Sequence, residues 1–260
     1  MSQNGDPAAT DASVERARAV MSGASRVAVL TGAGISTDSG IPDFRGPQGV
    51  WTKNPEAEKQ ATLMHYLGDP DIRKRAWQSR VRNGAFTAEP NLGHRALVDL
   101  EHQGRMHTLI TQNVDGLHQK AGSSESVVVE IHGTLHEVMC MSCDDRAPMQ
   151  VALDRVRAGE EDPPCRSCGG ILKSATVSFG QSLDERALMR AEAAARECDV
   201  MLAVGSTLTV YPIAEVVPVA KSAGAAVVIV NGGPTGHDGL ADALVMGSIS
   251  AVLPDLVRAD

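Results

Sequence analysis

Five short runs of apolar, mostly β-branched residues constrain the fold of this chain more than any other feature. They are Val27–Leu30, Thr108–Thr111, Val127–Ile131, Val200–Val204 and Val227–Val230. Runs of this length and character are typical of parallel strands that are buried on both faces of a sheet. Helical patterns separate these runs, and strands that alternate with helices predict an α/β fold built on a doubly wound parallel sheet.

Several of the helical patterns carry signals for where a helix begins or ends. We expect helices over Ala12–Ser22, Asp71–Val81, Gly93–His102, Asp184–Cys198 and Ile213–Ala223. Gly104 can end the third of these helices, and Asp184 can cap the start of the fourth. Pro218 lies inside the last pattern and predicts that this helix starts late or bends.

Two segments, 47–90 and 136–175, do not follow the alternation of strands and helices. The first is polar and helical in character, and the second contains paired cysteines, so both are interpreted as insertions that form a smaller second domain. The predicted organisation is a disordered tail over 1–11, a large domain over 12–46, 91–135 and 176–260, and a small domain over 47–90 and 136–175.

Composition excludes some classes of function. Apolar residues make up 43% of the 260 residues and the net charge is −8, with no long Lys/Arg cluster. This balance argues against direct nucleic-acid binding and fits a basic partner such as a lysine-rich protein segment. No apolar run approaches the roughly 20 residues that a membrane span needs. The N-terminal sequence lacks the features of a secretory signal or a transit peptide, so we expect a cytoplasmic location.

Four of the five cysteines form two pairs, Cys140-x2-Cys143 and Cys165-x2-Cys168, with 21 residues (144–164) between them. Four thiolates at this spacing predict one tetrahedral Zn²⁺ site, which would be structural because no ligand position is left for water. Free thiols or a redox pair are the alternative. Cys198 stands apart and is interpreted as a buried apolar residue.

A glycine-rich loop, Thr31-Gly-Ala-Gly-Ile-Ser36, directly follows the first predicted strand. Glycines at these positions let the backbone approach a pyrophosphate, and a following helix N-terminus offers free N–H groups. Thr37 stands where a full dinucleotide fingerprint has a third glycine, so an ordinary turn remains an alternative. The loop continues through Pro42-Asp-Phe-Arg45, where Phe44 either covers a ligand or pins the loop.

Polar residues follow the other four strands. They are Gln112, Asn113 and Asp115, then His132-Gly133, then Gly205-Ser206-Thr207, and finally Asn231. Each motif alone could be a turn. Ligands of open α/β sheets bind outside the carboxyl ends of the strands, so the shared location favours a binding site. Histidine is well suited to accept a proton near neutral pH, which makes His132 the candidate base. His118 is interpreted as a packing residue, and His136 is not needed as a metal ligand.

Together these motifs resemble the sirtuin, or Sir2-like, family of NAD-dependent protein-lysine deacylases. The carriers are Gly32–Ser36, Gly40–Gly46, Thr111–His118, Ile131–Gly133, the two cysteine pairs, Phe179-Gly180, Gly205–Thr207 and Asn231. The resemblance extends from about residue 15 to the end of the chain. It implies a Rossmann-like large domain and a small domain made of a zinc ribbon and a helical insert. NAD would be consumed as a co-substrate, Zn²⁺ would be structural, and acyl-lysine proteins or peptides would be the partners.

The resemblance also implies roles for single residues. The NAD-binding positions would be Gly32, Ala33, Gly34, Ser36, Asp43, Phe44, Arg45, Gln112, Asn113, Asp115, Gly205, Ser206, Thr207, Asn231 and Ile249. His132 and Asn113 would be catalytic. The substrate backbone would pair with Thr176–Gly180 and Leu208–Tyr211, and so contact Val177, Phe179, Gly180 and Val210.

The implied chemistry starts with attack of the acyl oxygen on the ribose carbon as nicotinamide leaves. His132 then takes a proton from the ribose hydroxyls, and water completes the release of lysine and 2′-O-acyl-ADP-ribose. Gln181 and Thr176 depart from the Glu and Val that are usual in the family, which affects substrate affinity rather than mechanism. Arg80 and Asn83 replace the Tyr-x-x-Arg pair of members that remove succinyl or malonyl groups, so acetyl or another uncharged acyl group is favoured.

Three other functions remain open at this point. A dehydrogenase would share the glycine-rich loop but would have no need of Pro42–Arg45 over the ribose carbon. A mono-ADP-ribosyltransferase would share the first step and use a different acceptor. A zinc-stabilised NAD sensor would not need Asn113, Asp115 and His132 together.

Overall fold

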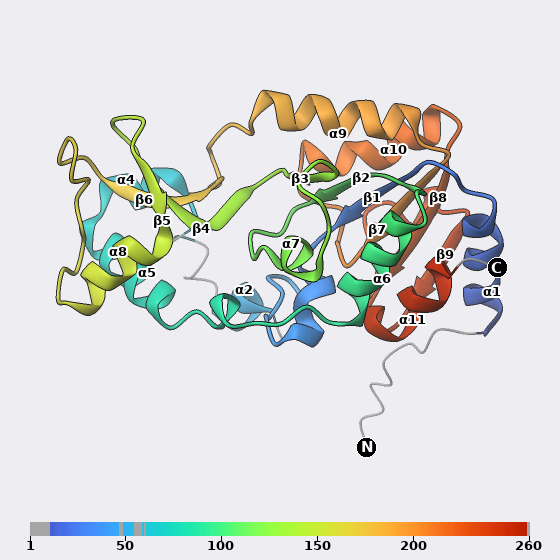
Figure 1. Cartoon of the computed structure of the whole chain (residues 1–260), viewed down its shortest axis with the longest axis horizontal. Helices are drawn as coiled ribbons and strands as arrows, with labels where there is room; N and C mark the ends of the chain where they lie inside the picture. Colours follow the sequence, from blue (N-terminus) through green and yellow to red (C-terminus); the bar gives the residue numbers. More distant parts are fainter. Residues whose placement is uncertain (1–10, 47–48, 55–58, 60, 259–260) are drawn as a thin grey trace, which may run out of the picture.

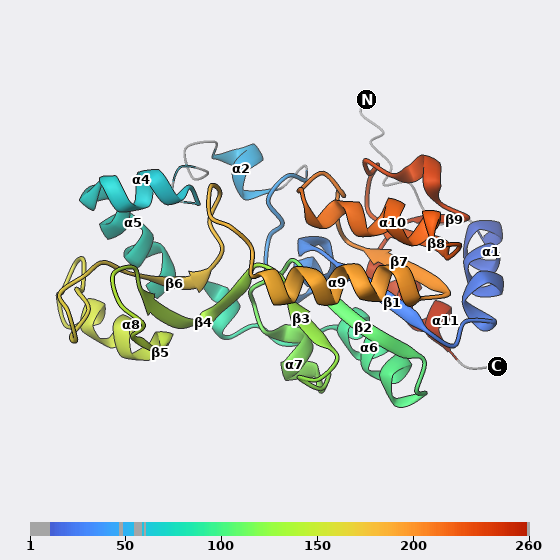
Figure 2. The same ribbon diagram turned by 90° about the horizontal axis from the view of Figure 1, so that it is seen from above.

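The computed structural model describes residues 11–46, 49–54, 59 and 61–258 of the chain. Two units lie end to end along its long axis: a six-stranded sheet covered by helices, and a three-stranded sheet with helices of its own (Figures 1 and 2). Among the described residues, no helix has both the length and the apolar character to cross a membrane. The predicted tail lies outside the described residues, except that helix α1 already begins at Asp11.

The larger sheet is entirely parallel. Its strands are β1 (Val27–Thr31), β2 (Met106–Thr111), β3 (Val128–Glu130), β7 (Val200–Val204), β8 (Ala226–Asn231) and β9 (Ala243–Met246). Their order is β3-β2-β1-β7-β8-β9. Strands β2 and β3 follow in turn on one side of β1, and β7, β8 and β9 follow in turn on its other side. The carboxyl ends of β1, β2 and β7 therefore meet at the switch point, where ligands of such sheets bind.

Helices cover both faces of this sheet (Figure 1). One face carries α1 (Asp11–Ser22), α6 (Leu92–His102) and α11 (Ile249–Val257), and the other carries α9 (Glu185–Glu197) and α10 (Val216–Ser222). Alternate residues of β1 divide between the two faces: Val29 packs in the first apolar cluster, and Leu30 packs in the second. Burial of both faces explains why the strands read as continuous apolar runs.

The smaller sheet is antiparallel and is formed by the second insertion and the residues on either side of it. Its strands, in the order β5-β4-β6, are β5 (Arg146–Pro148), β4 (Gly133–Cys140) and β6 (Leu172–Thr176). The accompanying helices are α4 (Leu63–Gly68), α5 (Pro70–Val81) and α8 (Met149–Arg157). Trp77 of α5 packs with Val138 of β4 and Leu153 of α8 in one apolar cluster. The two insertions thus share a core, which supports the predicted small domain; its limits stay a prediction.

Shorter helices complete the described chain. They are η1 (Ala33–Ser39), α2 (Val50–Lys53), η2 (Gly84–Phe86), α7 (Leu117–Ala121), η3 (Ile213–Glu215) and η4 (Asp238–Leu240).

The α/β fold class is confirmed, and so are the five predicted strands. The Asp184 side chain accepts a hydrogen bond from the Ala187 N–H at 2.8 Å and caps α9 as expected. Helix α10 begins at Val216, which places Pro218 in its first turn, where its missing N–H breaks no helical bond. Strand β9 and helix α11 were not predicted. Strand β9 is a four-residue edge strand, too short to give a clear pattern.

Candidate active site

The glycine-rich loop crosses directly over the end of β7. The Gly34 N–H donates to the Gly205 carbonyl oxygen at 2.8 Å, and the Gly32 N–H donates to Val204 O at 3.0 Å. A Cβ atom on Gly34 would lie 2.7 Å from the Gly205 Cα, so only glycine permits this approach. Gly205 itself has φ +65°. Gly32, Gly34 and Gly205, three predicted NAD-binding residues, therefore form one backbone junction.

Ser36, Asn113 and Asp115 form a buried polar cluster beneath this loop. The Ser36 hydroxyl donates to Asp115 Oδ2 at 2.7 Å, and the Asn113 Nδ2 donates to Ser36 Oγ and to Gly32 O, both at 3.2 Å. The second carboxylate oxygen of Asp115 accepts from the Leu117 N–H at 3.0 Å. All three side chains are buried, so the cluster fixes a carboxylate and an amide close to the carboxyl ends of β1 and β2.

Two buried histidines lie behind this cluster, with ring centroids 5.0 Å apart. His94 Nδ1 accepts from the Asn91 N–H in a capping box, and its Nε2 lies 3.5 Å from Ser36 Oγ. His118 Nε2 lies 2.9 Å from Thr31 Oγ1. Burial lowers the pKa of His94 to about 4 and that of His118 to about 3, so both rings are neutral at pH 7.

His94 was not predicted as a site residue, because a histidine in an amphipathic helix carries no signal that it will be buried. His118 was interpreted as a packing residue, and its side chain is indeed only 1% exposed.

His132 stands between the two sheets, immediately before β4. Its Nδ1 lies 3.0 Å from the Gln112 carbonyl oxygen, to which it donates, so Nε2 is left to accept a proton. Burial lowers the pKa of His132 below its ordinary value of 6.5, partly offset by the bond to Gln112. The neutral ring that a general base requires therefore prevails at neutral pH.

Backbone contacts hold His132 next to the predicted substrate strand. Its carbonyl oxygen accepts from the Val177 N–H at 2.8 Å. Gly133 follows with φ +72°, and a Cβ there would lie 2.1 Å from Ala175 O. Glycine at 133 thus allows β4 and β6 to pair directly beside the histidine.

Further predicted residues gather at the ends of β2, β7 and β8. Gln112 Nε2 donates to Ser206 Oγ at 2.8 Å, which joins residues from opposite sides of β1. Asn231 ends β8, and its Nδ2 donates to Gly233 O at 2.7 Å. Ile249 Cδ1 would lie 2.9 Å from a Cβ on Gly205, so Ile249 lines the glycine junction. Thr207 is half-buried, and its hydroxyl lies 2.9 Å from that of Thr209.

The second half of the loop, Pro42–Arg45, makes an aromatic contact that was not predicted from the sequence. The Phe44 ring lies 4.7 Å from that of Trp51, and the Arg45 guanidinium lies 4.7 Å from the same Trp51 ring. The Asp43 side chain accepts from the Gly46 N–H at 2.9 Å and closes the turn. Ala33 opens the short helix η1 in the first half of the loop.

The predicted substrate residues lie in two segments that are far apart in sequence. Phe179 is paired as an isolated parallel bridge with Thr62, and Gly180 follows it with φ +82°. Gln181, the departure from the family pattern, folds back so that its side chain accepts from the Ser178 N–H at 3.2 Å. Val210 is half-buried in the stretch between β7 and η3.

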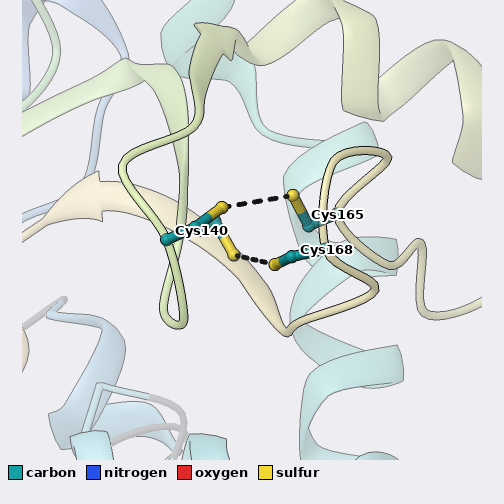
Figure 3. Close-up of side chains that lie close together, drawn as sticks. Cys140, Cys165 and Cys168 are labelled. Carbon is teal, nitrogen blue, oxygen red and sulfur yellow. Dashed lines mark hydrogen bonds between the residues drawn. The ribbon is translucent and has the colours of Figure 1, made fainter.

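The four paired cysteines converge near the end of the small sheet where Cys140 pairs with Leu172, opposite to the end that adjoins His132. Figure 3 shows the sulfur atoms of Cys140, Cys165 and Cys168 turned toward one another. The Sγ atoms of Cys140 and Cys168 are 3.5 Å apart, those of Cys143 and Cys165 are 3.8 Å apart, and all four lie within 4.8 Å of one another.

Zinc–sulfur bonds of about 2.3 Å in a tetrahedron require sulfurs roughly 3.8 Å apart. The thiol cluster therefore fits a structural Zn²⁺. His136 is not part of it: its Nε2 lies 2.7 Å from Asp115 O. Cys198 is buried among apolar residues of the large sheet, as expected.

Comparison with known proteins gives a consistent result. A model of the Sir2 family matches residues 32–212. The chain is 51% identical over 238 residues to NAD-dependent protein deacetylase 2 of Streptomyces coelicolor, covering 92% of this chain and 99% of that protein. It is 38% identical to NAD-dependent protein deacylase 2 of Archaeoglobus fulgidus, covering 94% of this chain and 95% of that protein.

Solved structures agree with the sequence relatives. A Sir2 enzyme structure superposes with a TM-score of 0.86 at 37% identity, covering 95% of this chain and 97% of the other. A complex of Sir2 with a p53 peptide and NAD⁺ superposes with a TM-score of 0.80 at 32% identity, covering 90% and 93%.

Proposed function

Because the chain belongs to the Sir2 family and is an NAD-dependent protein deacetylase, we propose that His132 is its general base and that acyl-lysine peptides bind beside it. The observation that carries this proposal is the placement of His132. Its Nδ1 is tied to Gln112 O, and its backbone is bonded to Val177 of the predicted substrate strand. One residue thus joins the NAD crevice to the substrate strand.

NAD supplies the ribose carbon that accepts the acyl oxygen, with nicotinamide as the leaving group. We propose that the Gly32–Ser36 loop holds the pyrophosphate, since its glycines leave the backbone open to a phosphate. Asp115 would bind the nicotinamide carboxamide from the polar cluster with Ser36 and Asn113. Gln112 and Ser206 would bind ribose hydroxyls, and Asn231 and Ile249 would contact the adenosine half.

The base step follows from the tautomer of His132. Nδ1–H donates to a backbone carbonyl, so Nε2 carries the lone pair that takes a proton from the ribose hydroxyls. The 2′ oxygen then attacks the acyl carbon. Phe44 is 44% exposed at the edge of the loop, from where it would shield the reacting carbon from water. Water then adds to the resulting intermediate and completes the release of free lysine and 2′-O-acyl-ADP-ribose.

The substrate peptide would add a strand to the Val177–Gly180 segment, with Val210 on the other side. Strand addition recognises the peptide backbone and reads little sequence. Solved relatives include Sir2 bound to an acetylated peptide. The same mode is proposed for this chain, with acetyl-lysine as the preferred residue.

The surroundings of Arg80 do not support a charged acyl class. The Arg80 guanidinium lies over the Trp77 ring at 4.9 Å and over the Tyr66 ring at 5.4 Å, and its Nη2 donates to Ser174 Oγ at 3.2 Å. Its Nη1 is buried without an acceptor among the described residues. Both rings are fully buried, so this donor lies inside the small domain, and acetyl or another uncharged acyl group stays the proposed class.

Mass spectrometry of NAD incubated with a panel of acyl-lysine peptides tests the proposal. Acetyl-lysine peptides are expected to give free lysine, nicotinamide and 2′-O-acetyl-ADP-ribose in equal amounts. NADH would instead indicate a dehydrogenase, and ADP-ribose attached to protein without deacylation would indicate a mono-ADP-ribosyltransferase. Faster turnover of succinyl- than acetyl-lysine would contradict the proposed preference for an uncharged acyl group.

A further inference from the structure

Trp51 connects two parts of the molecule that have separate roles in the proposed reaction. Its ring lies 4.7 Å from Phe44 of the NAD loop and 5.5 Å from Phe179 of the substrate strand. The ring planes are tilted by 37° and 55°, and both separations fall in the attractive range for aromatic pairs. The Arg45 guanidinium also packs on this ring at 4.7 Å.

The backbone on either side of Trp51 is attached to the same two parts. On one side, the Trp51 N–H donates to Phe44 O at 3.0 Å, and the Val50 N–H donates to Asp43 O at 2.8 Å. On the other side, the Leu63 N–H donates to Phe179 O at 3.0 Å, and the Phe179 N–H donates to Ala61 O at 2.8 Å. Helix α2 therefore starts on the NAD loop, and the chain beyond it pairs with the substrate strand.

Phe44 and Phe179 both retain surface for a ligand. Phe44 is 44% exposed and Phe179 is 39% exposed, while Trp51 between them is only half-buried. Each phenylalanine can thus touch its own ligand with one side and Trp51 with the other. A shift of either ring changes its contact with Trp51.

We propose that Trp51 is a positioning residue that couples binding of the acyl-lysine peptide to the placement of Phe44 over NAD. The inference rests on the proposed roles of Phe44 and Phe179. When a peptide strand adds at Val177–Gly180, it fixes the Phe179 ring. Trp51 then favours the arrangement of Phe44 and Arg45 that closes on NAD. Coupling between two sites is reciprocal, so NAD strengthens peptide binding by the same factor.

Calorimetry on the full-length zinc-loaded protein tests the coupling. The probe is carba-NAD, a carbocyclic analogue whose bond to nicotinamide does not break, titrated with and without an acetyl-lysine peptide. For the wild type we expect the peptide to tighten carba-NAD binding about tenfold, within the usual range for coupled sites. In Trp51→Leu, which keeps apolar bulk but loses the ring, the factor should fall below about twofold.

Matched variants show whether the ring itself is responsible. Trp51→Phe restores an aromatic ring and should recover most of the coupling. Met64→Ala changes a side chain that is 73% exposed in the same insertion and should leave the factor at the wild-type value. Each binding constant measured alone should change by less than about threefold in Trp51→Leu, since the direct ligand contacts remain.

Three results would overturn the inference: a wild-type factor near one, an unchanged factor in Trp51→Leu, or equal loss of coupling in Trp51→Phe and Trp51→Leu. An assay of nicotinamide release by the wild type distinguishes an error in the proposed coupling from an error in the proposed function. If the wild type deacylates the peptide but the factor does not depend on Trp51, only the coupling is wrong. If it does not deacylate any peptide, the proposed function fails first.

Tryptophan fluorescence gives a second readout. The chain has two tryptophans, and Trp77 is fully buried in the small core. In a Trp77→Phe background, addition of peptide alone should change the Trp51 emission if the strand acts on this ring. An emission that responds only to carba-NAD would contradict the proposed action of the peptide strand on this ring.

Discussion

His132 donates through Nδ1 to the carbonyl oxygen of Gln112, 3.0 Å away, so the atom left to accept a proton is Nε2. The partner is a backbone atom at the end of β2 and does not depend on a second titrating side chain. The ring of the proposed base is thus oriented by a backbone atom of the large sheet.

Replacement of the proposed base, His132, should reduce turnover and leave NAD binding nearly unchanged. His132→Ala removes the proton acceptor and leaves the loop, the polar cluster and the substrate strand in place. We expect acyl-ADP-ribose formation to fall by about 10²–10⁴-fold with NAD affinity within about threefold of the wild type. Calorimetry and a nicotinamide-release assay measure the two quantities. Wild-type turnover in His132→Ala would rule out the assignment.

The pH profile of turnover should report the same residue. Burial lowers the pKa of His132 below 6.5, and only the neutral ring can accept a proton. Activity should therefore be constant through neutral pH and decline on the acid side, with a midpoint below 6.5. Measurement of kcat/KM from pH 5 to pH 9 gives this midpoint. A midpoint above 7 would show that another group is being titrated.

The two buried histidines should make the fold sensitive to acid. The pKa values of His94 and His118 are lowered to about 4 and about 3, whereas in the unfolded chain both are near 6.5. Below pH 6.5 the unfolded chain binds protons that the folded chain does not, so stability falls with pH until the folded-state pKa values are reached. At pH 5 the loss is about 2 kcal/mol for each ring.

Urea unfolding at pH 7 and pH 5 measures this loss. His118→Gln retains a donor for Thr31 but has no titrating ring, so its loss between the two pH values should be smaller by about 2 kcal/mol. Equal losses in the wild type and in His118→Gln would show that other groups cause the acid sensitivity.

Gly133→Ala should damage both the fold and the catalytic site. The left-handed conformation costs a non-glycine residue about 1–2 kcal/mol, and the new Cβ would overlap Ala175 O. We expect a lower melting temperature and at least a tenfold loss of turnover, because β4 must move beside His132. Gly104→Ala is the control: φ is +71° there, against +72° at Gly133, but the space is open. Gly104→Ala should lower the melting temperature through the same backbone strain but leave turnover at the wild-type value.

Removal of zinc should unfold the small sheet. Cys140 and Cys165 belong to the apolar cluster that joins β4, α5 and α8, so their displacement exposes that core. We expect one zinc per chain in the wild type, less than one in Cys168→Ser, and a lower melting temperature after chelation. Elemental analysis and thermal unfolding measure these effects. Cys198→Ser should keep its zinc, since Cys198 lies at the end of α9 in the large unit, away from the thiol cluster.

The sequence was sufficient for features that depend on local pattern. Both faces of the large sheet are covered, so strands such as Val200–Val204 are continuously apolar and easy to recognise. Strand β6 was not recognised because Lys173 and Ser174 interrupt its pattern. The Lys173 side chain is nevertheless 1% exposed, and its ammonium donates to the carbonyl oxygens of Ser174 and Thr176. Burial lowers the pKa of Lys173 to about 8.

Features that depend on contacts between distant segments could not be read in the same way. The predicted polar residues do gather where β1, β2 and β7 end, because parallel strands bring their carboxyl ends to one edge. The packing of Trp51 between Phe44 and Phe179 depends on how an insertion folds back across the crevice. No local pattern encodes that path.

The position of β1 in the sheet also has a consequence for synthesis. Residues up to Glu130 contain β1, β2 and β3, which can pair as they leave the ribosome. The other edge of β1 must wait for β7, since Val27 pairs with Val200. Until then an apolar strand edge is open to pairing with another chain. We infer that C-terminal truncations before residue 200 will aggregate rather than yield a smaller folded protein.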